Sequence, residues 1–74
     1  MVTEKEINEI IEMAKETGVE ITEFDFEELR MGAYFSCVHE AEFNNRDLED
    51  VCEVYELNVE VANVIQEYSK RVQC

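Results

Sequence analysis

The stretch FEELRMGAYFSCVHEAEF, residues 26–43, decides the fold, because its apolar side chains recur with helical spacing. One face carries Phe26, Leu29, Ala33, Tyr34, Cys37 and Ala41, and Met31, Phe35 and Val38 extend the apolar arc around the helix. A helix that is apolar over most of its circumference is packed on more than one side. We therefore expect one central helix over residues 26–43, with Asp25 as its N-cap and Gly32 admitting a close neighbouring backbone.

Three shorter helices are predicted around this segment. Thr3 and Glu6 have the spacing of a capping box, and Gly18 suits the end of the helix that follows. Beyond Asn44–Asn45, helices are expected over residues 47–56 and 59–72, the second with Asn58 as its N-cap. The inward residues of these two are Leu48, Val51, Cys52, Tyr55, Val61, Ala62, Ile65, Tyr68 and Val72. The predicted fold is all-α, a bundle of four short helices, and residues 19–24 form a connector that is either extended or helical.

The charge of the chain limits its partners. Nineteen acidic residues against six basic ones give a formal net charge of −13 in 74 residues. This balance argues against direct nucleic-acid binding, which requires Lys and Arg against phosphates, and favours a basic protein partner. The 46% of hydrophobic residues indicates a folded core and not a disordered acidic tail. We expect one acidic domain, residues 1–74, located in the cytoplasm, with no signal peptide and no membrane-spanning segment.

Two acidic stripes are the main candidate for a binding surface. They consist of Glu9, Glu12 and Glu16 on the first helix, and of Glu49, Glu53, Glu56 and Glu60 across the last two. Side chains three or four residues apart on a helix lie roughly 5–6 Å apart, which is close to the spacing of phosphates along a nucleic-acid strand. In composition the chain is similar to small acidic DNA mimics, including phage-encoded inhibitors of restriction or CRISPR nucleases. The alternative is that these stripes are ordinary solvated helix faces.

Residues 48–68 resemble a helix-turn-helix motif. The resemblance is carried by Leu48, Val51 and Cys52 on the first helix, by the turn at Leu57–Asn58, and by Ala62 and Ile65 on the second helix. Glu56 replaces the glycine usual in the turn, and no Lys or Arg precedes Lys70 on the would-be recognition helix. The solvent side of that helix is expected to present Val59, Glu60, Asn63, Val64, Gln66 and Glu67. The resemblance implies DNA reading by Asn63 and Gln66, beside glutamates that phosphate repels.

The sequence gives little support for catalysis. Its single histidine, His39, is two residues from Cys37, so the two side chains point to different sides of a helix and cannot act as a nucleophile–base pair. Residues 44–50 lack the central glycine of a calcium loop. We therefore predict no enzymatic activity, no cofactor and no metal. Cys37 and Cys52 are interpreted as small core residues, and the terminal Cys74 as exposed.

Three functional hypotheses follow. The first is a non-enzymatic regulator or inhibitor that occupies the basic, nucleic-acid-binding surface of a partner protein through the seven glutamates of the two stripes. The second is an assembly module that forms a homodimer through residues 26–43, with Met31, Phe35 and Val38 in the interface. The third is a transcriptional regulator of the helix-turn-helix type. Phe24, Phe26, Phe35 and Phe43 add a possible apolar patch, because a core of this size does not readily bury all four.

Overall fold

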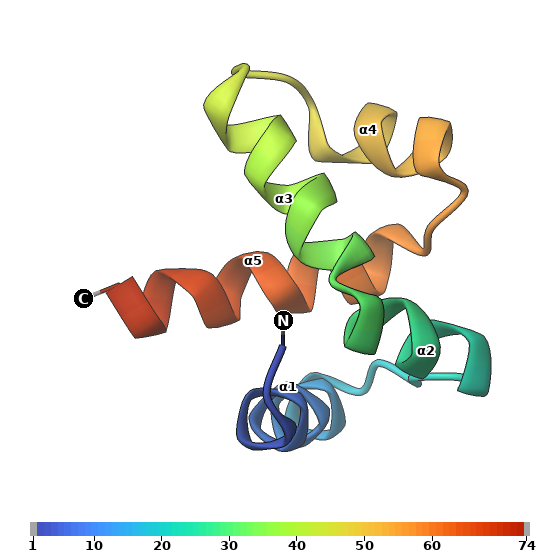
Figure 1. The fold of residues 1–74 in the computed structure, drawn as a ribbon, viewed down its shortest axis with the longest axis vertical. Helices are drawn as coiled ribbons and strands as arrows, with labels where there is room; N and C mark the ends of the chain where they lie inside the picture. The colour runs from blue at the N-terminus through green and yellow to red at the C-terminus, as the bar shows by residue number, and fades with distance from the viewer. Residues whose placement is uncertain (1, 74) are drawn as a thin grey trace.

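Five α-helices form the part of the chain that the computed structural model describes, residues 2–73 (Figure 1). They are α1 (Glu4–Thr17), α2 (Glu23–Met31), α3 (Ala33–Phe43), α4 (Leu48–Tyr55) and α5 (Val59–Gln73). No residue in the range 2–73 belongs to a β-strand. The predicted all-α class is confirmed, whereas the predicted number of four helices is wrong by one.

The additional helix arises at Gly32. Residues 26–43 do not form one helix, because Gly32 adopts a left-handed conformation, with φ of 85°, that ends α2. Its backbone N–H donates to the Leu29 carbonyl at 3.1 Å, and α3 begins at the next residue. Glycine takes this conformation without the steric penalty of a Cβ atom. Gly32 thus serves as a helix cap and bend, and not as the predicted gap for a neighbouring backbone.

The start of α2 also differs from the prediction. Thr22 is the N-cap, and its hydroxyl accepts a hydrogen bond from the Asp25 backbone N–H at 3.2 Å. The Asp25 side chain accepts in return from the Thr22 backbone N–H at 3.3 Å. Asp25 is therefore the third helical residue of a capping box and not the cap itself. The predicted capping box at Thr3 and Glu6 and the helix end at Gly18 are confirmed.

The core lies where α3 and α5 cross. Helix α3 packs against α2, α4 and α5, and α5 also packs against α1 and α4. Figure 1 shows α4 near one end of the long axis and α1, seen nearly end-on, at the other. The largest fully buried side chains are Tyr34, Ile10, Leu29, Ile65, Val51 and Val61. Three individual placements were predicted wrongly: Val64 is buried, and Tyr55 and Val72 are exposed.

A buried hydrogen-bond chain connects α2, α3 and the turn before α5. The Tyr34 hydroxyl donates to Asp25 Oδ1 at 2.7 Å and accepts from the Asn58 backbone N–H at 3.0 Å. The other Asp25 oxygen accepts from the Thr22 hydroxyl at 2.9 Å. Asp25 is the single buried charged side chain among residues 2–73, with 4% of its surface exposed. A buried carboxyl group requires such partners, so these contacts fix how the three segments meet.

The turn between α4 and α5 contains a backbone conformation that glycine normally takes. Glu56 ends α4 in the left-handed region with φ of 59°. The Leu57 N–H donates to the Cys52 carbonyl at 2.9 Å, which closes the helix end. Asn58 then caps α5, as predicted, because its side-chain oxygen accepts from the Glu60 N–H at 2.9 Å.

Replacement of the Tyr34 hydroxyl tests the buried chain. Tyr34→Phe leaves the Asp25 carboxyl group and the Asn58 N–H without their partner, and we expect a loss of about 2 kcal/mol in the free energy of unfolding. Urea unfolding followed by circular dichroism measures it. Tyr55→Phe removes a hydroxyl whose hydrogen bond is solvent-exposed, so it is the matched control and loses far less. Equal losses in both variants would show that the buried hydrogen bonds contribute no more to the free energy of unfolding than the exposed one.

Replacement of Glu56, whose backbone is left-handed, is predicted to stabilise the protein. Glu56→Gly removes the steric penalty of a Cβ atom at positive φ, and we expect a gain of up to about 1 kcal/mol after the entropy of glycine is subtracted. Thermal unfolding measures this gain as a higher midpoint. Glu53→Gly, inside α4, is the control and lowers the midpoint, because glycine destabilises a helix interior. A lower midpoint for Glu56→Gly would contradict the assigned turn.

Candidate protein-binding surface

All seven glutamates of the predicted stripes have exposed side chains. Those of α1, namely Glu9, Glu12 and Glu16, line a hollow of about 370 Å³ that Tyr68 and Arg71 of α5 complete. The pKa of the Tyr68 hydroxyl is raised, first by burial and then by the negative charges of Glu9 and Glu6. The carboxylates of α1 thus lie close enough to α5 to act on one of its side chains.

The second stripe is divided between two places. Glu49, Glu53 and Glu56 are exposed on α4 and its C-terminal cap, whereas Glu60 lies on the first turn of α5. Figure 1 places α1 and α4, which carry most of these glutamates, near opposite ends of the long axis. Glu60 instead faces a hollow between α1 and α5.

This hollow combines an apolar floor with an acidic rim. It has a volume of about 190 Å³ and is lined by Met13, Thr17, Val19, Glu60, Asn63, Val64 and Glu67, and we call it the α1–α5 hollow. Met13 and Val64 are buried and Val19 is half-buried, whereas Glu60, Asn63 and Glu67 are exposed. The sequence analysis missed it, because Val64 was expected to face solvent and Met13 was not considered.

Local hydrogen bonds hold the α1 wall of this hollow in place. Gly18 is left-handed with φ of 77°, and the Val19 N–H then donates back to the Ala14 carbonyl at 2.8 Å. The Thr17 hydroxyl donates to the Met13 carbonyl at 3.0 Å. This helix end folds Val19 back against the core, so the floor of the hollow exists before any partner binds.

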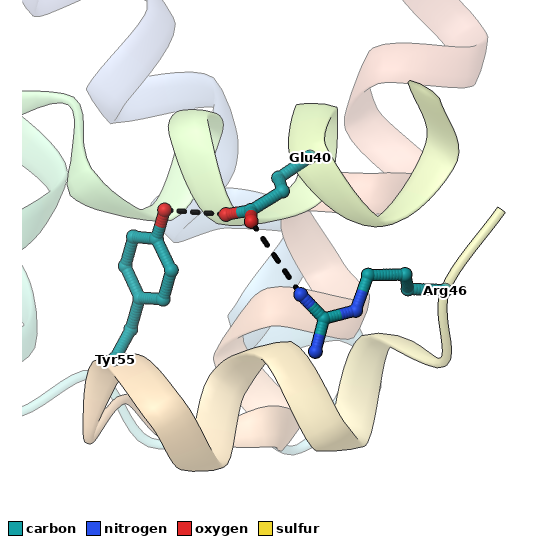
Figure 2. Close-up of polar contacts among 3 residues, drawn as sticks. All are labelled: Glu40, Arg46 and Tyr55. Carbon is teal, nitrogen blue, oxygen red and sulfur yellow. Dashed lines mark hydrogen bonds and ion pairs between the residues drawn. The ribbon is translucent and has the colours of Figure 1, made fainter. Parts of the chain in front are cut away.

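Few of the carboxylates have a basic partner within the chain. Among residues 2–73 the ion pairs are Arg46–Glu40 at 3.6 Å and Lys70–Glu67 at 3.8 Å. Figure 2 shows that Glu40 also accepts a hydrogen bond from the Tyr55 hydroxyl, and this bond raises the pKa of Tyr55. Glu40 therefore joins α3 to α4 and to the loop before it. None of the seven stripe glutamates has an ion pair of this kind within the described range.

The predicted dimer patch is not one surface. Met31 is 77% exposed, Phe35 is half-buried against the core, and Val38 is 3% exposed. The prediction that Val38 takes part in an exposed interface is wrong, because α3 turns this side chain into the core. Phe24, 58% exposed, lies two turns before Met31 on α2, and the acidic residues Glu27 and Glu28 occupy the turn between these two apolar side chains. Phe43 is exposed at the end of α3 and stacks on the ring of His39.

The two described cysteines are buried, apart from the exposed ring of His39. Cys37 is buried and His39 is exposed, which confirms that the two side chains point in different directions. Cys37 Sγ instead lies 3.4 Å from Cys52 Sγ across the α3–α4 interface. Burial raises the pKa of Cys37, and burial together with the contact to Cys37 raises that of Cys52 to about 12. Within residues 2–73, no three metal-binding side chains come together. Cys74 lies outside the described residues.

No protein-family model, curated protein or solved structure matches this chain. The described helices also include none with the length and apolar character that a bilayer crossing requires.

The buried thiols predict how stability depends on pH. The pKa of Cys52 is about 12 in the folded protein and roughly 8.5 in the unfolded chain, so the unfolded state loses its proton first as the pH rises. The contribution of this thiol to the free energy of unfolding is constant below pH 8. Above about pH 9 it decreases, by at most about 1.4 kcal/mol per pH unit for each thiol. Urea unfolding at pH 7, 9 and 10.5 measures the decrease.

The matched variant for this measurement is Cys52→Ala. It lowers stability at every pH but reduces the slope above pH 9, because the thiol with the largest shift is gone. An unchanged slope would mean that other groups cause the alkaline loss. Tyr34, whose pKa is also raised by burial and by the hydrogen bond to Asp25, accounts for part of the slope that remains.

Proposed function

We propose that this protein is a non-enzymatic acidic regulator or inhibitor that binds the basic, nucleic-acid-binding surface of a partner protein. The observation that carries this proposal is the absence, within residues 2–73, of ion pairs to any of the seven stripe glutamates, although all are exposed. Carboxylates that no internal cation neutralises are available to an external one. A cytoplasmic location belongs to the same proposal.

The net charge of −13 supports fast association with a cationic surface. Charge of one sign focuses the field and raises association rates by roughly 10–10³-fold, an effect that salt weakens. The acidic groups on α1 and α4 lie at opposite ends of the long axis, so a partner surface contacts one end at a time or bridges both. Occupation of a phosphate-binding surface by carboxylates is the mechanism of a DNA mimic, and it prevents nucleic acid from binding there.

A homodimer is a second candidate. Phe24 and Met31 are exposed apolar side chains on α2, and Phe26 and Met31 border one hollow there. Self-association through these side chains needs no opposite charge on the partner, so salt does not weaken it. The large negative charge opposes the approach of two copies, and for this reason we place this candidate second.

DNA reading by α5 is the third candidate. Asn63 is exposed but lies between Glu60 and Glu67 on the same face, and Gln66 is half-buried. Two carboxylates beside the reading residue repel the phosphates that dominate the affinity of DNA-binding proteins. The α4–α5 hairpin is interpreted as a structural unit, and we assign it no DNA-binding role.

Charge reversal tests the leading proposal. The partner is first captured from host extract at low salt, and release by competitor DNA shows that its basic surface is involved. In the triple variant Glu9→Lys, Glu12→Lys, Glu16→Lys, we expect the association rate with this purified partner to fall at least about tenfold, with a smaller change in dissociation. Stopped-flow or biosensor kinetics at two salt concentrations provide both rates.

The control triple carries the same change in charge at other exposed positions. It is Glu20→Lys, Glu23→Lys, Glu27→Lys, on α2 and the loop before it. The matched triple on α4 replaces Glu49, Glu53 and Glu56. Equal losses in all triples would mean that only the total charge matters, and no loss in any would reject the proposal. Capture of this chain alone, independent of salt and DNA, would favour the homodimer.

A further inference from the structure

We infer that the α1–α5 hollow binds one arginine or lysine side chain, presented by an α-helix of the partner protein. This inference rests on the proposed function, since it names the contact that follows electrostatic approach. It is carried by a different observation, namely the apolar floor and acidic rim of one small hollow. It also gives Glu60, Asn63 and Glu67 a common role, because all three line this hollow.

The size of the hollow selects a side chain over a small molecule. Its volume of about 190 Å³ is below the roughly 300–1,000 Å³ of ligand pockets. One long side chain from a protein fits a recess of this scale. The walls come from two helices, α1 and α5, and a groove between helices is a common seat for a third helix.

The distribution of polarity selects a cationic side chain. Met13, Val19 and Val64 form an apolar floor for the methylene stem of arginine or lysine. Glu60 and Glu67 lie on the same face of α5, about 10 Å apart along the helix axis, so one of them at a time receives the charged end. An apolar anchor would leave these carboxylates without a partner, and an acidic anchor would be repelled.

The chain itself does not satisfy this site. Lys70 reaches Glu67 at 3.8 Å, but both side chains are more than 60% exposed, so the pair contributes little and an incoming cation replaces it easily. Arg71 lines the hollow around Tyr68 and does not line this one. A second copy of the chain is a poor occupant, because two molecules of charge −13 repel each other.

A synthetic peptide provides the probe. It is an 18-residue amphipathic helix with leucine on one face and arginine on the other, and a second peptide has citrulline, a neutral isostere, in place of every arginine. We expect the arginine peptide to shift the backbone amide resonances of Met13, Thr17, Val19 and Asn63 in two-dimensional NMR spectra. The citrulline peptide is expected to bind at least tenfold more weakly.

A variant with a filled hollow distinguishes binding at this site from general electrostatic attraction between the peptide and the protein. Asn63→Trp places an indole in the hollow without altering the charge, and we expect at least tenfold weaker binding of the arginine peptide. Asn8→Trp is the matched control, since Asn8 is exposed on α1 and lines neither the α1–α5 hollow nor the hollow around Tyr68. Its affinity should equal that of the wild type. Lys70→Gln, which removes the competing cation, should strengthen binding about twofold.

The outcomes separate this inference from the proposed function. If charge reversal on α1 slows association with the captured partner but Asn63→Trp binds the peptide and the partner normally, the inference is overturned and the proposed function stands. If Asn63→Trp weakens peptide binding while charge reversal has no effect on the partner, the hollow is real and the proposed function fails. Resonance shifts centred on α2, or a dimer in sedimentation, would also overturn the inference.

Discussion

The hydroxyl of Tyr34 is the contact on which the arrangement of the helices depends. It connects the carboxyl group of Asp25 at the start of α2 with the backbone of Asn58 at the start of α5, and it does so from within α3. Apolar packing alone would permit these helices to slide or rotate against one another. A buried carboxyl group tolerates only the geometry that supplies its donors. The hydrogen bonds to Asp25 therefore select one arrangement of the helices among those that apolar packing would permit.

Local signals in the sequence predicted three helix ends correctly, whereas the side-chain cap of α2 was placed at Asp25 instead of Thr22. Thr3, Gly18 and Asn58 act as expected, because each signal is local and depends on few neighbours. Gly32 was misread because its neighbours on both sides continue the same apolar pattern, which conceals a change of direction. A glycine within an apolar run fits both a tolerated helix position and a left-handed cap, and only the tertiary structure distinguishes them.

The candidate site was predictable in part for the same reason. Exposure of the seven glutamates follows from charge and helical spacing, since a carboxylate without a partner remains in water. The α1–α5 hollow was not predictable, because its residues come from segments about 45 positions apart in the chain and meet only through packing. Val64 shows the limit most clearly: the helix-turn-helix comparison placed it in solvent, whereas α1 covers that side of α5.

Charge and stability oppose each other in a domain of this size. Mutual repulsion of the carboxylates destabilises the compact state, and a core built from 74 residues has little free energy to offset it. The structure limits this conflict by keeping every acidic side chain except Asp25 out of the core and by placing the acidic groups of α1 and α4 at opposite ends. A cationic partner that binds only the folded state neutralises part of the repulsion and stabilises the fold by mass action. The acidic surface that destabilises the free protein is thus, on the proposed function, the surface that makes the complex favourable.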